Sequence, residues 1–523
     1  MSDLSKPLAK RRIPAKIVID TILITTDDCT DSLFLNNKIN YRSEVNFKMI
    51  MIMKKLKYLI LIVSVLNVQA CIGQKKQTSR TKYVLLNNQV IEKVENAKLV
   101  VGKVEKSSAN PLFVEDKPWE KRFDNLYGNV IYDEEDELYK CWYSPFIIDN
   151  SAEGMSLKER EKSYDAPDER EMAICYATSK DGIHWEKPNL GLIDFEGNKN
   201  NNIIWRGKGQ GGDHWAGPHG GGIFKDLHEK DPNRRYKALF KIEELSIGFS
   251  KDGLHWDEYQ PCEGAVTVAG DTHNNALWAP TLNKYVGITR TWGKMGREVA
   301  RVESDDFIHW TKEEVVLEGL DVNLQPYAMP VFYYGGVYLG LVAIHNQKTD
   351  RVHTELTWSP DTKKWNRISP GTSLIPCSDK KLDYDYGCVY ACAYPVFEKD
   401  EIKLYYGGSD WLHFGWRNGA MGLATLRPDG FAGYVAKSSP AKIVTKEIFY
   451  SGGNIYLNAD INEGGHLIVR VLDKDGKSLA KSEKLSANLI NSELQFDKKI
   501  KKGNITLQFD FVNAKVYSFD LEK

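Results

Sequence analysis

The hydrophobic positions of this chain follow the short period of β-strands. Runs of five or six residues that alternate polar and apolar side chains, or are continuously apolar, are bounded by turn-forming Gly, Asp, Asn and Ser. This length and period are typical of strands that bury one or both faces. The pattern therefore predicts an all-β protein. The clearest runs are residues 138–143, 236–240, 285–289, 337–342 and 402–406.

A seven-residue motif recurs along the same region. Ser-Lys-Asp-Gly-Ile-His-Trp occupies residues 179–185 and returns, with Ser, Asp and Trp in one register, at 250–256, 304–310 and 359–365, and in degenerate form at 421–431. The spacing of roughly 55 to 70 residues fits a four-stranded propeller blade with its loops. Because Asp accepts local backbone N–H bonds and Gly adopts positive φ, we expect the motif to form the turn between the third and fourth strands of each of five blades.

The motif and its spacing resemble those of five-bladed β-propeller glycosidases, namely glycoside hydrolase families 32 and 43, the invertase and arabinanase type. The resemblance covers residues 120–435 and implies a five-bladed β-propeller whose innermost strands surround a shared funnel. It specifies the fold more than the chemistry, since one fold hosts many activities.

The last part of the chain breaks the repeat. Short strand-like runs separated by Gly, Asp and Asn turns occupy residues 440–523, with a hairpin signal, Asp-Lys-Asp-Gly, at 473–476. We expect a small β-sandwich accessory domain here, either a stability element or, as in the resembling enzymes, a carbohydrate-binding module. Residues 71–119 are expected to form an N-terminal linker and lead-in to the propeller.

Residues 1–70 are interpreted as an upstream extension followed by a signal peptide. A basic segment at 53–57 precedes an apolar stretch at 58–66 that is too short to span a bilayer, and small residues at 68–70 precede Cys71. This resembles a bacterial lipoprotein signal, which implies cleavage before Cys71 and acylation of its thiol. A transmembrane anchor and a plain secretory signal remain alternatives. Because no acidic run follows Cys71, the resemblance favours an outer-membrane anchor facing the periplasm.

Charge and cysteine content narrow the function classes further. The 70 basic and 71 acidic residues leave a net charge of -1, without the basic footprint of a nucleic-acid-binding protein. No CxxC or His-rich pattern has zinc spacing, so no cofactor is expected, although a structural cation in the channel stays open. Cys141 and Cys175 lie in strand-like runs, which favours buried free thiols over disulfides.

Two carboxylates are the candidate catalytic residues. Aligning the innermost strands on Val130 and Leu277 places Asp124 and Asp271 at equivalent positions of the first and third blades. Glycoside hydrolysis needs one carboxyl to protonate the leaving oxygen and another to activate water or attack the sugar. The resemblance implies that Asp124 is the base or nucleophile. It also implies a Glu acid in the third blade, where this chain has the shorter Asp271.

Further polar residues near these strand ends are candidates for substrate binding. Arg290 and Arg297 flank Trp292 and suit an anionic sugar such as a uronate or a sulfated residue, because guanidinium groups pair with planar anions. Surface salt bridges are the alternative reading of these arginines. The complete set of expected substrate-binding residues is Asn125, Asp213, His219, His273, Arg290, Tyr327 and Asp385.

These features predict a glycoside hydrolase that acts on oligosaccharides from plant or algal polysaccharide, uronate-containing or sulfated ones included, through two funnel carboxylates. A non-catalytic carbohydrate-binding propeller is the alternative, because the third-blade Glu is missing. A Tyr/His pair such as Tyr327 with His219 or His273 keeps a lyase open as well.

Overall fold

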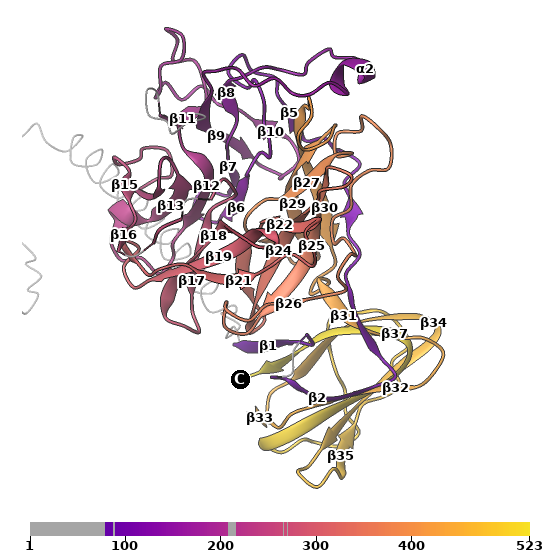
Figure 1. Ribbon diagram of the computed structural model, residues 1–523. Coiled ribbons are helices and arrows are strands. Elements are labelled where there is room, and N and C mark those ends of the chain that lie inside the picture. Colours follow the sequence, from indigo (N-terminus) through magenta and orange to yellow (C-terminus); the bar gives the residue numbers. More distant parts are fainter. Residues whose placement is uncertain (1–78, 87–88, 208–215, 265, 269) are drawn as a thin grey trace, which may run out of the picture. The chain divides into compact units, whose positions relative to one another are not determined.

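The computed structural model describes residues 79–86, 89–207, 216–264, 266–268 and 270–523 (Figure 1). Apart from α2 (Leu157–Arg160) and the short 3-10 helix η1 (Pro232–Arg234), the elements in these ranges are strands. The prediction of an all-β protein is confirmed. The expected signal peptide and Cys71 lie outside the described residues, and no helix among those described is long and apolar enough to cross a membrane.

Most of the described strands form five antiparallel units in chain order. Unit 1 contains β6 (Asn129–Asp133), β7 (Leu138–Tyr143), β9 (Glu171–Ser179) and β10 (Trp185–Glu186), with β8 (Phe146–Ile148) and β11 (Ile203–Arg206) on β9. Unit 2 contains β12 (His219–Lys225), β13 (Tyr236–Lys241), β14 (Leu245–Ser250) and β15 (Gln260–Pro261). Unit 3 contains β17 (Asn275–Ala279), β18 (Lys284–Gly293), β19 (Gly296–Ser304) and β21 (Glu314–Leu317), next to the pair β16 (Glu263–Gly264) and β20 (His309–Trp310).

The remaining two units complete the series. Unit 4 contains β22 (Leu324–Ala328), β23 (Val331–Tyr334), β24 (Val337–Asn346), β25 (Arg351–Ser359) and β26 (Asn366–Arg367). Unit 5 contains β27 (Cys388–Ala391), β28 (Val396–Phe397), β29 (Ile402–Ser409) and β30 (Gly419–Leu426), and its outer edge is filled by β4 (Glu105–Lys106) and β5 (Phe113–Val114). Residues 105–114 therefore belong to unit 5, which corrects the expected linker over 71–119.

The repeated motif forms the turn that the sequence predicted. In the second copy, the Asp252 carboxylate accepts hydrogen bonds from the backbone N–H groups of Leu254 and His255 at 2.9 and 2.8 Å, while Ser250 Oγ accepts from Gly253 N at 2.9 Å. The copies beginning at residues 179, 304 and 359 repeat the aspartate bonds. Gly253 has φ 79°, as the turn requires.

Asparagine side chains join the first strands of successive units. Asn129 donates to Gly221 O at 2.7 Å and accepts from Ile223 N at 3.0 Å, which ties unit 1 to unit 2. Asn275 ties unit 3 to unit 4 in the same way, and its Oδ1 accepts from Val331 N at 3.1 Å. These side chains hydrogen-bond to backbone groups of the next unit, although the first strands of the two units are not paired with each other.

Backbone contacts complete the links between units. Asn274 N donates to Gly220 O at 2.8 Å between units 2 and 3, and Ala393 N donates to Gly128 O at 2.8 Å between units 5 and 1. The last unit therefore returns to the first.

Strand register corrects the alignment of unit 3. In unit 1, Val130 pairs with Cys141. The residue of unit 3 that corresponds to Cys141 is Gly287, and it pairs with Ala276, one residue before Leu277. The sequence alignment therefore placed the unit-3 positions one residue too late. A shift of one residue moves a side chain to the opposite face of the sheet.

The remaining strands form a separate C-terminal sheet around the long strand β37 (Gly503–Glu522). β34 (Ile455–Leu472) follows one side of β37, and four short strands pair in succession with its other side. These four are β33 (Ile448–Tyr450), β32 (Ala441–Thr445), β31 (Ala432–Ala436) and β1 (Arg80–Val84); β2 (Ile91–Glu95), β3 (Lys98–Val101), β35 (Ser478–Lys481) and β36 (Leu489–Glu493) complete the sheet.

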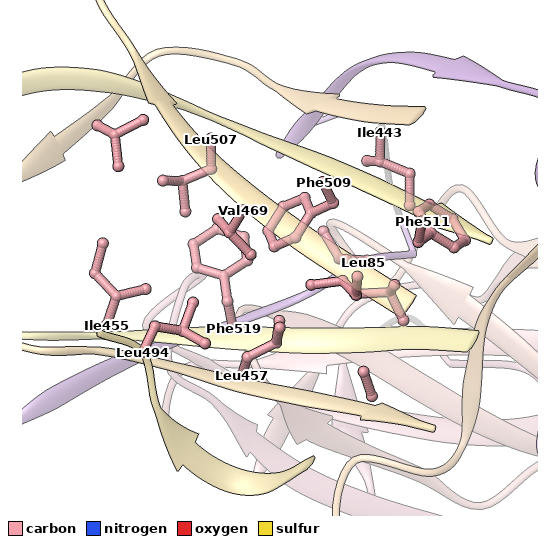
Figure 2. Packing of buried hydrophobic residues seen from close by; sticks show 14 of the residues in the cluster. Leu85, Ile443, Ile455, Leu457, Val469, Leu494, Leu507, Phe509, Phe511 and Phe519 are labelled. Carbon is pink, nitrogen blue, oxygen red and sulfur yellow. The ribbon is translucent and has the colours of Figure 1, made fainter. Parts of the chain in front are cut away.

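Residues from both ends of the chain build this sheet. The expected linker contributes β1, β2 and β3, and the sheet begins at Ala432 rather than at residue 440, which corrects both boundaries. Figure 2 shows its core, where Leu85 of the N-terminal segment lies among Leu457, Phe509 and Phe519. The N-terminal strands were unreadable as part of this sheet because their partners lie about 400 residues away, and local periodicity gives no information about such pairing.

Cysteines and the degenerate motif have structural roles. All six cysteines in the described ranges are free, and Cys141 and Cys175 are buried, as the sequence predicted.

In the degenerate copy of the motif, the Asp429 carboxylate binds Lys82 Nζ at 2.7 Å and accepts from Asn458 Nδ2 at 2.7 Å, so it anchors unit 5 to the C-terminal sheet.

The turn geometry predicts a stability effect. Replacing Asp252 by Ala leaves the N–H groups of Leu254 and His255 without their acceptor, and we expect the free energy of unfolding to fall by about 1–2 kcal/mol. Urea denaturation measures this change. The matched control is Asp257→Ala, an exposed position whose side chain makes no hydrogen bond within the described part of the chain. Equal free energies of unfolding for Asp252→Ala and Asp257→Ala would show that the aspartate of the motif does not stabilise the fold.

Candidate functional site

Asp124 lies in a strained loop that leads into unit 1. Asp124, Leu126 and Tyr127 have φ values of 53°, 63° and 44°, a left-handed conformation that side-chain-bearing residues rarely adopt. Such strain persists only where the surrounding structure enforces it, and it gathers at functional sites. The loop aims the Asp124 carboxylate at Arg417, whose Nη2 lies 2.5 Å from Asp124 Oδ1.

Two arginines keep Asp124 ionised. Burial raises the pKa of Asp124, but the charges of Arg417 and Arg122 outweigh it and hold the pKa below its usual value. Arg122 Nε lies 3.4 Å from Asp124 Oδ1. Asn125 stands beside the pair, since its Oδ1 accepts from Arg417 Nη2 at 3.1 Å. A carboxylate that stays charged at neutral pH suits a base or a nucleophile.

Asp271 is the second carboxylate, and it too is ionised. Its Oδ1 contacts His219 Nε2, and its Oδ2 lies 3.6 Å from Arg290 Nη2. Burial raises the pKa of Asp271, but His219 and Arg290 outweigh burial and hold the pKa well below its usual range. Asp271 alone therefore lacks the proton that a general acid needs.

Tyr127 lies next to a neighbour of each carboxylate, because its hydroxyl accepts from Asn125 Nδ2 at 2.7 Å and its ring adjoins His219. Burial raises the pKa of Tyr127 well above its usual value, and the charges of Tyr327, Asp271 and Asp124 add to that shift. Its ring lies 5.4 Å from His219 and 5.6 Å from the ring of His273. Asp124 and Asp271 were predicted from the sequence, whereas Tyr127 was not.

Tyr327 links this centre to two arginines of unit 3. The guanidinium groups of Arg290 and Arg297 lie 5.1 and 4.8 Å from the Tyr327 ring centre. Both arginines also flank the Trp292 indole, at 5.4 and 4.9 Å. We call Asp124, Tyr127, His219, Asp271, Arg290, Arg297, Tyr327 and Arg417 the central cluster.

The other histidines near the cluster are neutral. Burial lowers the pKa of His273 to about 3, and its Nε2 lies 3.1 Å from Asn129 Oδ1. Burial, together with the charge of Arg417, lowers the pKa of His413 well below its usual value. Neither imidazole holds a proton to donate at neutral pH.

One expected substrate-binding residue, Asp385, contacts groups of unit 5 rather than the central cluster. The Asp385 carboxylate is buried and binds Lys106 Nζ at 2.5 Å and the Tyr406 hydroxyl at 2.9 Å, which gives it a structural role in unit 5. Asp213 lies outside the described residues. Among the residues that the structure describes, no group of three or more His, Cys, Asp or Glu side chains is arranged to hold a metal ion.

Glu115 binds the backbone near two residues of the central cluster. Its Oε1 accepts hydrogen bonds from Phe123 N at 2.5 Å and from Gly419 N at 3.0 Å, so it joins the segment of Asp124 to that of Arg417. Burial raises the pKa of Glu115 to about 8, so the carboxyl group is largely protonated at neutral pH. No sequence signal marked Glu115 or Arg417, because Gly419, which donates to Glu115, and Asp124, which pairs with Arg417, lie about 300 residues away in the chain.

The raised pKa of Glu115 predicts a pH-dependent effect. The unfolded chain loses the Glu115 proton near pH 4.5 and the folded protein near pH 8, so this group stabilises the fold at low pH and the contribution is lost as pH rises through about 8. Gln cannot ionise. We therefore expect the free energy of unfolding of Glu115→Gln to increase relative to that of the wild type as pH rises from 5 to 8. Urea denaturation measures this difference. Glu243→Gln, in an exposed turn, is the control and should show no such trend.

Comparisons with known proteins find similar solved structures at low sequence identity. No family model matches the chain, and no curated protein does. Similar solved structures include a glycosyl hydrolase from Bacteroides ovatus (16% identity, 63% of this chain, 94% of that chain, TM-score 0.42) and the catalytic domain of a Coprinopsis cinerea family 62 α-L-arabinofuranosidase (10%, 62%, 97%, 0.40). An N-acetylgalactosamine deacetylase from F. plautii, solved with blood group B trisaccharide, is another (14%, 67%, 95%, 0.38).

Proposed function

We propose that this chain is a glycoside hydrolase acting on oligosaccharides from plant or algal polysaccharide. The five units would form the blades of a five-bladed β-propeller, with the C-terminal sheet closing on itself as a β-sandwich. The observation that carries the proposal is a pair of ionised carboxylates from different units, Asp124 paired with Arg417 and Asp271 with His219. Hydrolysis of an acetal uses two such groups, one to activate water and one to protonate the leaving oxygen.

The ionisation of the two carboxylates assigns their roles. Asp124, held charged by Arg417, takes a proton from the attacking water. Asp271, whose Oδ1 contacts His219 Nε2, passes a proton taken from that imidazole to the leaving oxygen, in place of the missing glutamic acid. Water adds to the anomeric carbon as the glycosidic bond breaks, so both protons are accounted for.

The proposal predicts loss of sugar release in three variants. Asp124→Asn, Asp271→Asn and His219→Asn remove the base, the group that passes the proton and the source of that proton, and we expect each to lower kcat by about 10²–10⁴-fold. Sugar release from a panel of plant and algal oligosaccharides measures this, with Glu243→Gln as the matched surface control and circular dichroism as the check on folding. A wild-type protein that binds an oligosaccharide and releases nothing would instead support a carbohydrate-binding propeller.

We also propose that the protein is exported and anchored by a lipid on Cys71, at the outer membrane and facing the periplasm. The support is the sequence pattern before Cys71 alone. We expect the protein expressed in a bacterial host to incorporate labelled palmitate and to sediment with membranes. Cys71→Ser should abolish both, whereas Cys29→Ser should change neither. Unchanged labelling in Cys71→Ser would reject the anchor.

A further inference from the structure

Two arginines of the hairpin between β18 and β19 are buried with unused hydrogen-bond donors. Arg290 and Arg297 have exposed fractions of only 6% and 7%. Arg290 Nε and Nη1, and Arg297 Nε, have no hydrogen-bond partner within the described part of the chain. Buried polar groups are nearly always satisfied, so these donors point to a group that the described part of the chain does not provide.

The charges around these arginines are out of balance. The nearest carboxylate, Asp271, lies 3.6 Å from Arg290 Nη2 and already contacts His219. No described carboxylate lies within 4.0 Å of Arg297, whose Nη1 donates to the neutral Gln325 Oε1 at 2.9 Å. Burial and the charge of Arg290 lower the pKa of Arg297. A buried guanidinium without a counter-ion is costly, and an anion bound between the two arginines would relieve that cost.

The surface next to these donors suits a sugar ring. Trp292 lies directly opposite Arg297 across the hairpin, so the two side chains project from the same face. Its indole is 62% exposed, although both arginines lie beside it. An exposed indole offers a flat apolar surface on which a sugar can stack while a substituent of that sugar reaches the buried donors.

We propose that Arg290 and Arg297 bind a negatively charged substituent of the substrate, a carboxylate or a sulfate ester, so that the substrate is an anionic oligosaccharide. The planar guanidinium group suits either anion, because it can donate two parallel hydrogen bonds. Since Arg290 also faces Asp271, the charged sugar adjoins the bond that is cut. This inference rests on the proposed function for the oligosaccharide, but anion binding itself does not require hydrolysis.

The test compares anions in the absence of any sugar. The thermal unfolding temperature of the full-length protein is titrated with sodium sulfate and, separately, with sodium acetate, each against sodium chloride at equal ionic strength. Sulfate raises the stability of many proteins without binding, so the readout is the difference between wild type and variants. The variants are Arg290→Gln and Arg297→Gln, and Arg470→Gln, which only breaks an ion pair with Asp510, is the control.

We expect wild type and Arg470→Gln to show a saturable rise in unfolding temperature with at least one anion, and each Gln variant of the cluster to weaken the apparent Kd about tenfold or more. A response to sulfate alone identifies a sulfate ester, and a response to acetate alone identifies a uronate. Equal responses of wild type and both cluster variants to both anions would overturn the inference.

Hydrolysis assays distinguish failure of the anion site from failure of the proposed hydrolase. If the enzyme cleaves neutral oligosaccharides and Arg290→Gln leaves kcat/KM unchanged on them and on their charged analogues, the anion site is rejected while the hydrolase stands. If no oligosaccharide is cleaved but the anion response depends on both arginines, the site stands and the proposed hydrolase fails.

Discussion

The ion pair between Asp124 and Arg417 holds the candidate site together. It joins the loop before unit 1 to the segment between β29 and β30 in unit 5, at the seam where the last unit meets the first. Glu115 bridges the same two segments through their backbone N–H groups. The contacts that close the series of units are thus the ones that position the candidate base, which couples the integrity of the fold to the geometry of the site.

Positive charge dominates the interior around this seam. Three buried arginines, Arg122, Arg290 and Arg417, lie within 4.0 Å of Asp124 or Asp271, and a fourth, Arg297, is buried with no described carboxylate within that distance. Both carboxylates stay ionised because of this excess, even though burial opposes ionisation. The same excess removes the protonated carboxyl that a glycosidase acid usually provides. A cluster of this kind sacrifices stability to gain an electrostatic field, as functional sites commonly do.

The parts of the fold that depend on neighbouring residues were predictable from the sequence, and those that depend on distant partners were not. The Ser-Asp turn could be predicted because Asp252 bonds to groups two and three residues away. Asp124 and Asp271 were found because they precede recognisable strands. The one-residue error at Leu277, the pairing of β1 with β37 and the role of Arg417 depend on register and on contacts hundreds of residues apart, which periodicity does not encode.

The position of β37 affects how this chain can acquire its structure during synthesis. β37 is the central strand that pairs with β34, β33, β32, β31 and β1. Lys523 N donates to Ser79 O at 2.8 Å, and Figure 1 shows the C-terminus beside β1. Segments made earlier must therefore wait for this partner until residues 503–522 have left the ribosome. Such long-range pairing slows folding and exposes strand edges meanwhile. A nascent chain released early would keep five strands without the partner that orders them.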